Sequence, residues 1–355
     1  PVYIESVHAM PDPGLASVTL RISLARRDAA SQATEHPLRL LARIYDPTGN
    51  LAAEQDRSFP PIHGARATVD LAIDIPNPQP WTPDHPRCYR AEVLLSGEGF
   101  EDTLSVVWGL CRFEARGPHF HLNGEPTLLR AAISWGWYPN NLAFPSVPLA
   151  EEEVQNARAL GLNALLLCGC PATPRLLQAA DRLGLMIVQD PAGVPGLNAE
   201  TSPEIDTFGS QLALARIRRL ARRDRNHPSL VWWRLVDPLQ DPSPLGLASP
   251  NASSSPDLLD VINGEDPTRL ATWGSGNGRA IACNPHATAR FGLYDLSQAE
   301  STALVWENDR GVEMIALAPP KPGAPLLCGP SARFAALPDL PALVRRYGDR
   351  VLPGS

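Results

Sequence analysis

The chain has 355 residues, of which 44% are hydrophobic, and this is enough for two domains with full cores. Charged residues make up only 19%, the net charge is −7 and no basic run stands out, so we expect no nucleic acid partner. The apolar runs are all shorter than the roughly 18 residues that a membrane helix needs, so we expect no membrane span.

The six cysteines give little reason to expect a metal or a cofactor. Only Cys168 and Cys170 are close in sequence, and Cys-Gly-Cys is neither a zinc nor a haem-attachment spacing. We interpret the cysteines as buried free thiols, with a disulfide or a metal role as the alternative. No signal peptide is visible and the sequence opens at Pro1, which indicates a processed or trimmed start and leaves the localisation unknown.

Residues 1–115 are predicted to be an all-β domain. Hydrophobic and polar residues alternate with a period of two in several short stretches, and no convincing helix lies between them. The expected strands are 18–24, 38–45, 69–75, 89–95 and 104–110. Short strands at this spacing predict an immunoglobulin-like β-sandwich.

After Gly117 the pattern changes, because apolar strands now alternate with amphipathic helices. Expected strands are 128–133, 164–167, 186–190, 230–236, 269–273, 280–284 and 326–328, and expected helices are one after Pro148 with Glu151, Glu152 and Glu153 in its first turn, 174–183, 208–224, 255–264 and 338–346. The fold class is therefore an Ig-like sandwich followed by a (β/α)8 TIM-type barrel at 116–355. Seven strands leave the barrel one short, so we expect it to be incomplete, or completed by a further domain or a partner chain.

Several stretches, in order along the chain, resemble glycoside hydrolase family 2, its β-mannosidase-like and β-galactosidase-like members in particular. They are Trp-Thr-Pro-Asp-His-Pro-Arg-Cys-Tyr at 81–89, Phe-His-Leu-Asn-Gly-Glu-Pro at 120–126, Gly-Leu-Asn-Ala at 161–164, Asp-Arg-Leu-Gly-Leu at 181–185, Val-Gln-Asp at 188–190, Arg-Arg-Asp-Arg-Asn-His-Pro-Ser-Leu at 222–230 and Asp-Pro-Thr-Arg at 266–269. The stretch at 222–230 is the most specific. The family's usual jelly-roll domain does not precede Pro1, which agrees with a fragment or a reduced architecture.

The same resemblance implies that the catalytic positions have been replaced. Retaining glycosidases need two carboxyl groups about 5 Å apart. The position of the family's acid/base Glu falls on Pro238, preceded by Asp237 in place of Asn, and the position of the nucleophile Glu falls on Gly329. Two supporting positions, an Arg and a His in the family, fall on Leu166 and Gly169. The resemblance therefore implies a catalytically degenerate member.

Other side chains at the strand ends are candidates for the site. Asp190 and Asp237 follow the third and fourth barrel strands and are fallback catalytic carboxylates. Aromatic faces stack on sugar rings, and Trp135, Trp137 and Trp273 follow or end strands. The candidate substrate-binding set is Trp135, Trp137, Asp190, Asp237, Trp273, Asn284 and His286. Packing and backbone hydrogen bonds are the alternative role for each.

Three functional hypotheses follow. The first is a pseudo-glycosidase that binds a carbohydrate or assists a polysaccharide pathway. The second is a structural or assembly scaffold without sugar binding. The third is an active glycosidase that uses Asp190 and Asp237. Fold alone does not choose among them, because function depends on the site.

Overall fold

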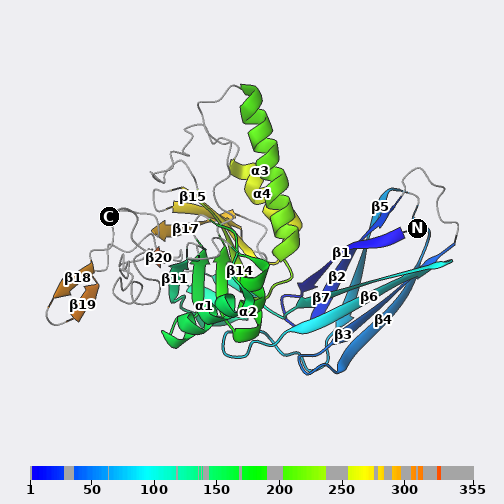
Figure 1. Cartoon of the computed structure of the whole chain (residues 1–355), viewed down its shortest axis with the longest axis horizontal. Coiled ribbons are helices and arrows are strands. Elements are labelled where there is room, and N and C mark those ends of the chain that lie inside the picture. The colour runs from blue at the N-terminus through cyan, green and yellow to red at the C-terminus, as the bar shows by residue number, and fades with distance from the viewer. Residues whose placement is uncertain are drawn as a thin grey trace, which may run out of the picture.

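The computed structural model describes residues 2–27, 36–62, 64–116, 119–134, 136, 138, 144–167, 170–189, 203–236, 255–275, 279–283, 290–296, 305–308, 311–314 and 326–328. Figure 1 shows a β-sandwich beside a second body in which helices cover a mixed sheet. None of the helices in the described ranges has the length and hydropathy to cross a membrane.

The N-terminal body is a sandwich of two antiparallel sheets, which confirms the predicted fold class. One sheet has the order β1 (Val2–Pro11), β2 (Ser17–Arg26), β5 (Arg66–Asp74), and the other β4 (Leu51–Phe59), β3 (Leu38–Tyr45), β6 (Tyr89–Gly97), β7 (Phe100–Trp108). The alternating apolar residues point inward, so that Leu20, Ile22, Leu40 and Val93 have no exposed surface. This pattern is why these stretches form strands with one buried face.

A small antiparallel sheet connects the two bodies. It contains β8 (Phe113–Arg116), β9 (His119–Leu122) and β10 (Glu125–Thr127), in the order β10-β9-β8. Since β8 spans residue 115, the predicted domain limits of 1–115 and 116–355 stay a proposal.

The second body begins as the predicted α/β barrel. Its elements are β11 (Ala131–Ser134), α1 (Val147–Ala159), β12 (Ala164–Leu167), α2 (Pro174–Leu183), β13 (Met186–Gln189), α3 (Pro203–Asp224), β14 (Leu230–Val236), α4 (Ser255–Glu265) and β15 (Leu270–Ser275). The five strands pair in parallel in chain order. The ends of helix α2 are set by its sequence. The Thr173 hydroxyl accepts a hydrogen bond from Leu176 N at 3.3 Å, and Gly184 ends the helix with φ of 80°.

The sheet then departs from the expected alternation of strands and helices. The remaining strands are β16 (Arg279–Cys283), β17 (Arg290–Leu296), β18 (Val305–Asn308), β19 (Gly311–Met314) and β20 (Leu326–Cys328). Strand β16 is antiparallel to β15 and to β17, and β17 is parallel to β20. Only residues 276–278 connect β15 to β16, and a parallel crossover needs a dozen or more residues, so this connection has to be a hairpin.

The described sheet has eight strands, in the order β11-β12-β13-β14-β15-β16-β17-β20. The expectation of seven strands was wrong because β17 was not predicted. Strands β11 and β20 are the two edges of this sheet in the part that the structure describes. The helix expected at 338–346 lies outside the described residues.

Candidate functional site

The carboxyl ends of parallel barrel strands define the expected mouth of the site. In register, Ser134, Leu167 and Gln189 end β11, β12 and β13 at the same edge, and β14 continues past them to Val236. This edge is where the family resemblance places the catalytic groups.

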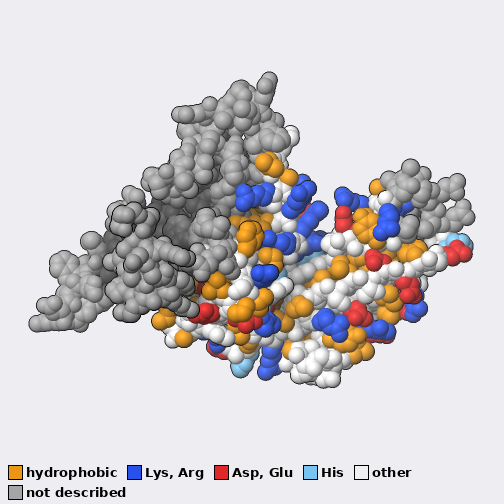
Figure 2. All heavy atoms as spheres, in the orientation of Figure 1, with side chains coloured by type: hydrophobic (Ala, Val, Ile, Leu, Met, Phe, Trp, Pro, Cys, Tyr) orange, Lys and Arg blue, Asp and Glu red, His pale blue; other side chains and the backbone are white. Residues whose placement is uncertain are grey.

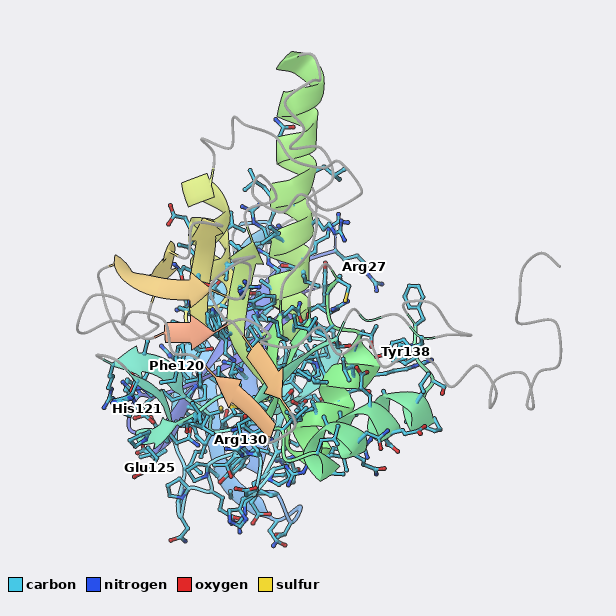
Figure 3. The ribbon with its side chains drawn as sticks, turned by 90° about the vertical axis from the view of Figure 1, so that its left-hand side faces the viewer. Arg27, Phe120, His121, Glu125, Arg130 and Tyr138 are labelled. Carbon is cyan, nitrogen blue, oxygen red and sulfur yellow. The ribbon has the colours of Figure 1, made fainter. Side chains whose placement is uncertain are left out.

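A polar cluster occupies the described part of this edge. Glu153 of α1 accepts hydrogen bonds from the Ser134 hydroxyl at 2.7 Å and from the Tyr138 hydroxyl at 2.5 Å. The Gly136 N–H donates to Ser134 Oγ at 3.3 Å. Burial, and then the Glu153 carboxylate, raise the pKa of Tyr138, so this phenol stays protonated and acts as a donor. Figure 3 shows Tyr138 close to α1 and away from Phe120 and Glu125 of the small sheet.

Glu153 was missed as a site residue because its surroundings were misread in the sequence. Helix α1 begins at Val147, with Ser146 as its N-cap, and no acidic residue lies in its first turn. Glu151, Glu152 and Glu153 therefore sit later in the helix than expected, and Glu153 reaches back to the end of β11. In the sequence, the one indication of this role is that Glu153 directly precedes Val154, which faces the core.

An apolar cluster fills part of the barrel interior below this edge. Leu166, Val188 and Trp232 pack in one buried cluster, whereas Leu165 and Ile187 face the helices. Phe120 enters the same cluster from the small sheet, with its ring centroid 5.4 Å from that of Trp232. The interior is therefore filled by side chains at its amino end, as barrel cores usually are.

A network of buried hydrogen bonds holds the barrel strands in register, and its residues come from the family-like stretches. Asp181 of α2 accepts from Ser229 N at 3.1 Å and from Ser229 Oγ at 2.6 Å, and its other oxygen lies 2.5 Å from His227 Nδ1. Trp81 Nε1 donates to the Asp181 carbonyl at 2.9 Å. The linker after the sandwich is thereby tied to α2 and to the start of β14.

The same network extends into the sandwich. The Asn226 side chain donates to Val7 O at 2.8 Å and accepts from Ala9 N at 2.9 Å, so it continues the backbone pairing of β1. Arg225 Nη2 donates to Ser6 Oγ at 3.2 Å. These contacts fix the start of β14 against the first strand of the chain.

His8 lies buried beside this network. Its Nε2 is 4.0 Å from Asp266 Oδ1, a carboxylate that also accepts from Trp233 Nε1 and Thr268 Oγ1. Burial, followed by the charges of nearby arginines, lowers the pKa of His8 well below its usual 6.5 despite Asp266. The imidazole is therefore neutral at the junction of the two domains.

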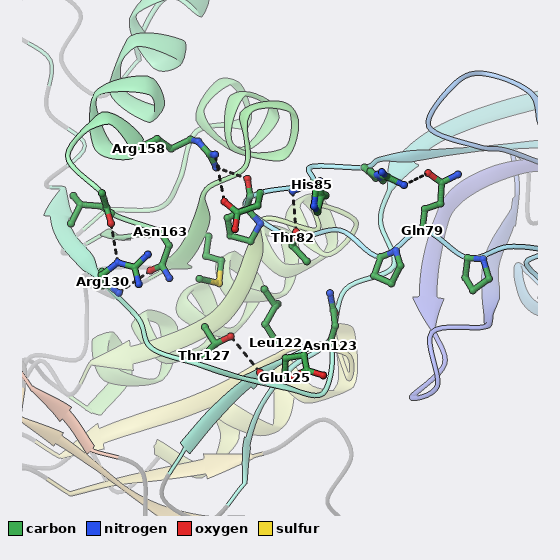
Figure 4. Close-up of a pocket in the computed structure, with 18 residues that line it drawn as sticks. Gln79, Thr82, His85, Leu122, Asn123, Glu125, Thr127, Arg130, Arg158 and Asn163 are labelled. Atoms are coloured by element: carbon green, nitrogen blue, oxygen red, sulfur yellow. Dashed lines mark hydrogen bonds and ion pairs between the residues drawn. The ribbon is translucent and has the colours of Figure 1, made fainter.

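A cavity of about 730 Å³ lies at the opposite end of the barrel, between the linker, β10 and the amino ends of β12 and β13 (Figure 4). Arg87 Nη1 donates to Gln79 Oε1 at 2.5 Å, and the other two arginines that line the cavity are bonded to backbone carbonyls. Arg130 Nε donates to Gly161 O at 2.9 Å, and Arg158 donates to Pro83 O and Gly184 O. We interpret these side chains as part of the domain junction.

Most of the sequence-predicted site residues lie outside the described residues. They are Trp135, Trp137, Gly169, Asp190, Asp237, Pro238, Asn284, His286 and Gly329. Trp273 lies in β15, where its backbone pairs with Leu235 and Ile281. Of the positions that the resemblance predicts to be replaced, Leu166 is the one among the described residues, and it is 7% exposed. The other assignments stay predictions.

Asn284 and His286 follow a strand that runs the other way. Because β16 is antiparallel to β15, its last residue, Cys283, pairs with Ala271 near the amino end of β15. Arg279, at the start of β16, pairs with Ser275 at the carboxyl end. The prediction of a sugar site at Asn284 and His286 was made for a parallel strand.

The sequence is similar to known glycosidases over 60–62% of the chain. It is 27% identical over 228 residues to a β-galactosidase of Pectobacterium atrosepticum, covering 62% of this chain and 21% of that protein. It is 25% identical over 220 residues to a putative β-glucuronidase of Formosa agariphila, covering 60% of this chain and 20% of that protein. The chain thus spans about a fifth of the length of these curated relatives.

The fold is also similar to solved structures. A glycosyl hydrolase family 2 member from Bacteroides cellulosilyticus superposes with a TM-score of 0.66 at 21% identity, over 77% of this chain and 35% of that one. At this identity the likeness shows the fold alone. The family model for glycosyl hydrolases family 2 matches residues 2–110, and the model for the TIM barrel domain of the same family matches residues 119–302. The chain belongs to glycosyl hydrolases family 2.

Proposed function

We propose that this chain binds a glycan at its barrel mouth without hydrolysing it, as a pseudo-glycosidase that assists a polysaccharide pathway. The observation that carries the proposal is the register of β14. Asn226 is bonded to the backbone of β1 at Val7 and Ala9, and β14 pairs with β13 and β15 up to Val236. The family resemblance assigns the acid/base position to Pro238, two residues after Val236 in the sequence, and a proline side chain has no proton to donate.

The environment of Leu166 also supports the proposed loss of hydrolytic activity. The resemblance implies an arginine here that holds the nucleophile, and Leu166 instead packs with Val188 and Trp232 in an apolar cluster. An apolar wall offers no hydrogen bond to a carboxylate, and a charge next to it would lose solvation. The replacement of Leu166 thus agrees with the loss of the nucleophile at Gly329.

Hydrolysis is tested first. The relatives are named β-galactosidase and putative β-glucuronidase, so aryl β-galactosides and aryl β-glucuronides are the probes. We expect no turnover above buffer. Turnover that disappears in Asp190→Asn or Asp237→Asn would establish an active enzyme with relocated carboxylates and refute the pseudo-glycosidase.

Binding is tested on a glycan array with the wild-type chain. We expect a signal that Trp135→Ala and Trp137→Ala abolish, because aromatic stacking supplies much of the affinity of sugar sites. Phe144→Ala is the matched control, since Phe144 is 76% exposed and follows the same strand. No turnover, no glycan signal and a defined oligomer would together favour the scaffold.

A further inference from the structure

The last part of α3 concentrates positive charge in a protein whose net charge is −7. Residues 216–225 contain six arginines, and the single acidic residue among them is Asp224. Five of these arginines are exposed: Arg216, Arg218, Arg219, Arg222 and Arg223. Figure 2 shows the blue side chains gathered along α3, beside the hollow that separates it from the sandwich.

The carboxylates close to this segment leave most of the charge unbalanced. Arg218, Arg222 and Arg225 all approach one carboxylate, Glu265 of α4, at 3.4, 2.7 and 3.7 Å. Asp224 is fully buried and is bonded to Arg223 and to Gln189 Nε2. Glu265 itself is only 14% exposed, so the solvent side of this surface presents guanidinium groups.

Arg216 and Arg219 carry positive charge that no nearby carboxylate among the described residues balances. Within the described ranges, no carboxylate lies within ion-pair distance of either side chain. Arg216, Arg219 and Arg223 are spaced i, i+3, i+7, so they form one stripe on the helix surface. At 1.5 Å per residue the stripe is about 10 Å long.

The opposite side of the hollow is the outer face of β1, β2 and β5. Arg21 and Arg66 lie there, each paired with one carboxylate, Asp70 and Glu5 respectively. The hydrogen bonds that Arg222 donates to Glu265, and more weakly the charge of Glu5 on β1, raise the pKa of Arg222. On the sandwich side these arginines are balanced by carboxylates, so the unbalanced positive charge lies on α3.

We propose that the arginine stripe of α3, formed by Arg216, Arg219 and Arg223, binds a carboxylate-bearing glycan chain. Guanidinium groups match carboxylates in charge and in planar geometry, and they suit an extended polyanion better than a neutral sugar. The proposal rests on the proposed function only for the class of ligand. It adds an acidic glycan and a second surface, on helix α3 outside the barrel strands.

The length of the stripe and the charge of the protein favour a short acidic glycan over nucleic acid. A duplex would extend far beyond the stripe of about 10 Å, onto a molecule that is acidic overall. A second copy of this chain, docked through an acidic face, is the other occupant that the test must separate.

The test is equilibrium binding of a labelled oligogalacturonate, measured by fluorescence anisotropy at low and at physiological ionic strength. A neutral galacto-oligosaccharide of equal length is the ligand control. We expect binding of the acidic ligand that weakens with salt, and a loss of about fivefold or more in Arg216→Gln/Arg219→Gln. Both side chains are exposed, so this variant should melt at the wild-type temperature.

The control variant is Arg39→Gln/Arg43→Gln, which removes the same charge from β3, in the other sheet of the sandwich. Equal losses in the two double variants would show that only net charge matters and would overturn the site. Equally tight binding of a DNA duplex would overturn the glycan assignment.

The protein could instead self-associate at low salt and bind no oligogalacturonate. If the α3 variant abolished that self-association, the occupant of the stripe would be a second copy of the chain and the glycan proposal would be overturned. Neutral glycan binding at the mouth is scored separately on the array, so failure of one proposal is distinguishable from failure of the other.

Discussion

His227 Nδ1 lies 2.5 Å from the Asp181 carboxylate, although 46 residues separate the two in the sequence. Burial alone would lower the pKa of His227, but the hydrogen bond and the charge of Asp181 outweigh it and raise the pKa above 6.5. The pair joins the end of α2 to the turn before β14. The position of the fourth barrel strand therefore depends on a polar contact inside the protein.

Asp181→Asn should lower the free energy of unfolding by about 2 kcal/mol, because the buried carboxylate bonds to both His227 and Ser229. Urea unfolding followed by circular dichroism measures the change. Asp84→Asn is the control and should be neutral, since the Asp84 side chain is 89% exposed. Equal effects from the two variants would contradict the role of Asp181.

Stability should fall as the pH decreases below about 6.5, owing to His8. Burial, and then Arg225 and Arg269, lower the pKa of His8 in the folded state. The unfolded chain binds a proton at the ordinary pKa that the folded chain does not bind, so acid favours unfolding. His8→Phe should flatten this acid limb in urea unfolding between about pH 5 and 7. His227 contributes the opposite slope above pH 6.5, and that limb should stay in the variant.

Gly184→Ala should destabilise the protein much more than Gly161→Ala. Both glycines have positive φ, of 80° and 76°, so both substitutions strain the backbone by about 1 kcal/mol. A Cβ at Gly184 would lie 2.0 Å from Pro83 O, whereas a Cβ at Gly161 meets nothing within 4 Å. The difference between the two melting temperatures measures the close approach of the linker to α2. Equal shifts would mean that this approach is looser in solution.

Leu166→Arg, which restores the residue that the family resemblance implies, should destabilise the protein by about 3 kcal/mol or more. Leu166 is 7% exposed and packs with Val188 and Trp232, so a guanidinium there has no solvent. Leu166→Met, of similar volume, should cost less than about 1.5 kcal/mol. A folded Leu166→Arg protein of wild-type stability would show that the interior still accommodates a charge, which weakens the case for a closed site.

Tyr138→Phe should lower stability by about 1 kcal/mol through loss of the hydrogen bond to Glu153. In wild type, the Tyr138 phenol should resist ionisation in an alkaline titration followed by ultraviolet absorbance, because burial and Glu153 raise the pKa of Tyr138. The variant should lose this late step and keep the others. Tyr3→Phe is the control, since Tyr3 is 39% exposed on β1.

Much of the fold was predictable from hydrophobic periodicity, and the exceptions have physical reasons. Strand β2 alternates strictly, which made it visible, whereas β4 is almost entirely exposed or partly exposed and has no apolar face to detect. Strand β1 contains a register shift between Ile4 and Ser6, which breaks the period of two.

The direction of β16 was predictable but was overlooked. The expected strands at 269–273 and 280–284 left six residues between them, too few for a helical crossover. Counting the residues in this connection would have predicted a hairpin in place of a parallel strand.

The polar contacts were less predictable. The family-like stretch at 222–230 identified Asn226 as a framework residue. The sequence did not indicate that the Asn226 side chain bonds to the backbone of Val7 and Ala9. Glu153 likewise gained its partners from the end of β11, which is remote in sequence. Periodicity detects buried faces, whereas side-chain hydrogen bonds depend on which elements meet.

The bond between Asn226 and β1 makes the two domains one cooperative unit. If the sandwich unfolded first, the Asn226 amide and the Arg225 guanidinium would lose their partners on β1. If the barrel unfolded first, β1 would lose the amide that continues its ladder. Partial unfolding is thus disfavoured from either side, and the first strand of the sandwich and the fourth of the barrel should melt together in a single transition.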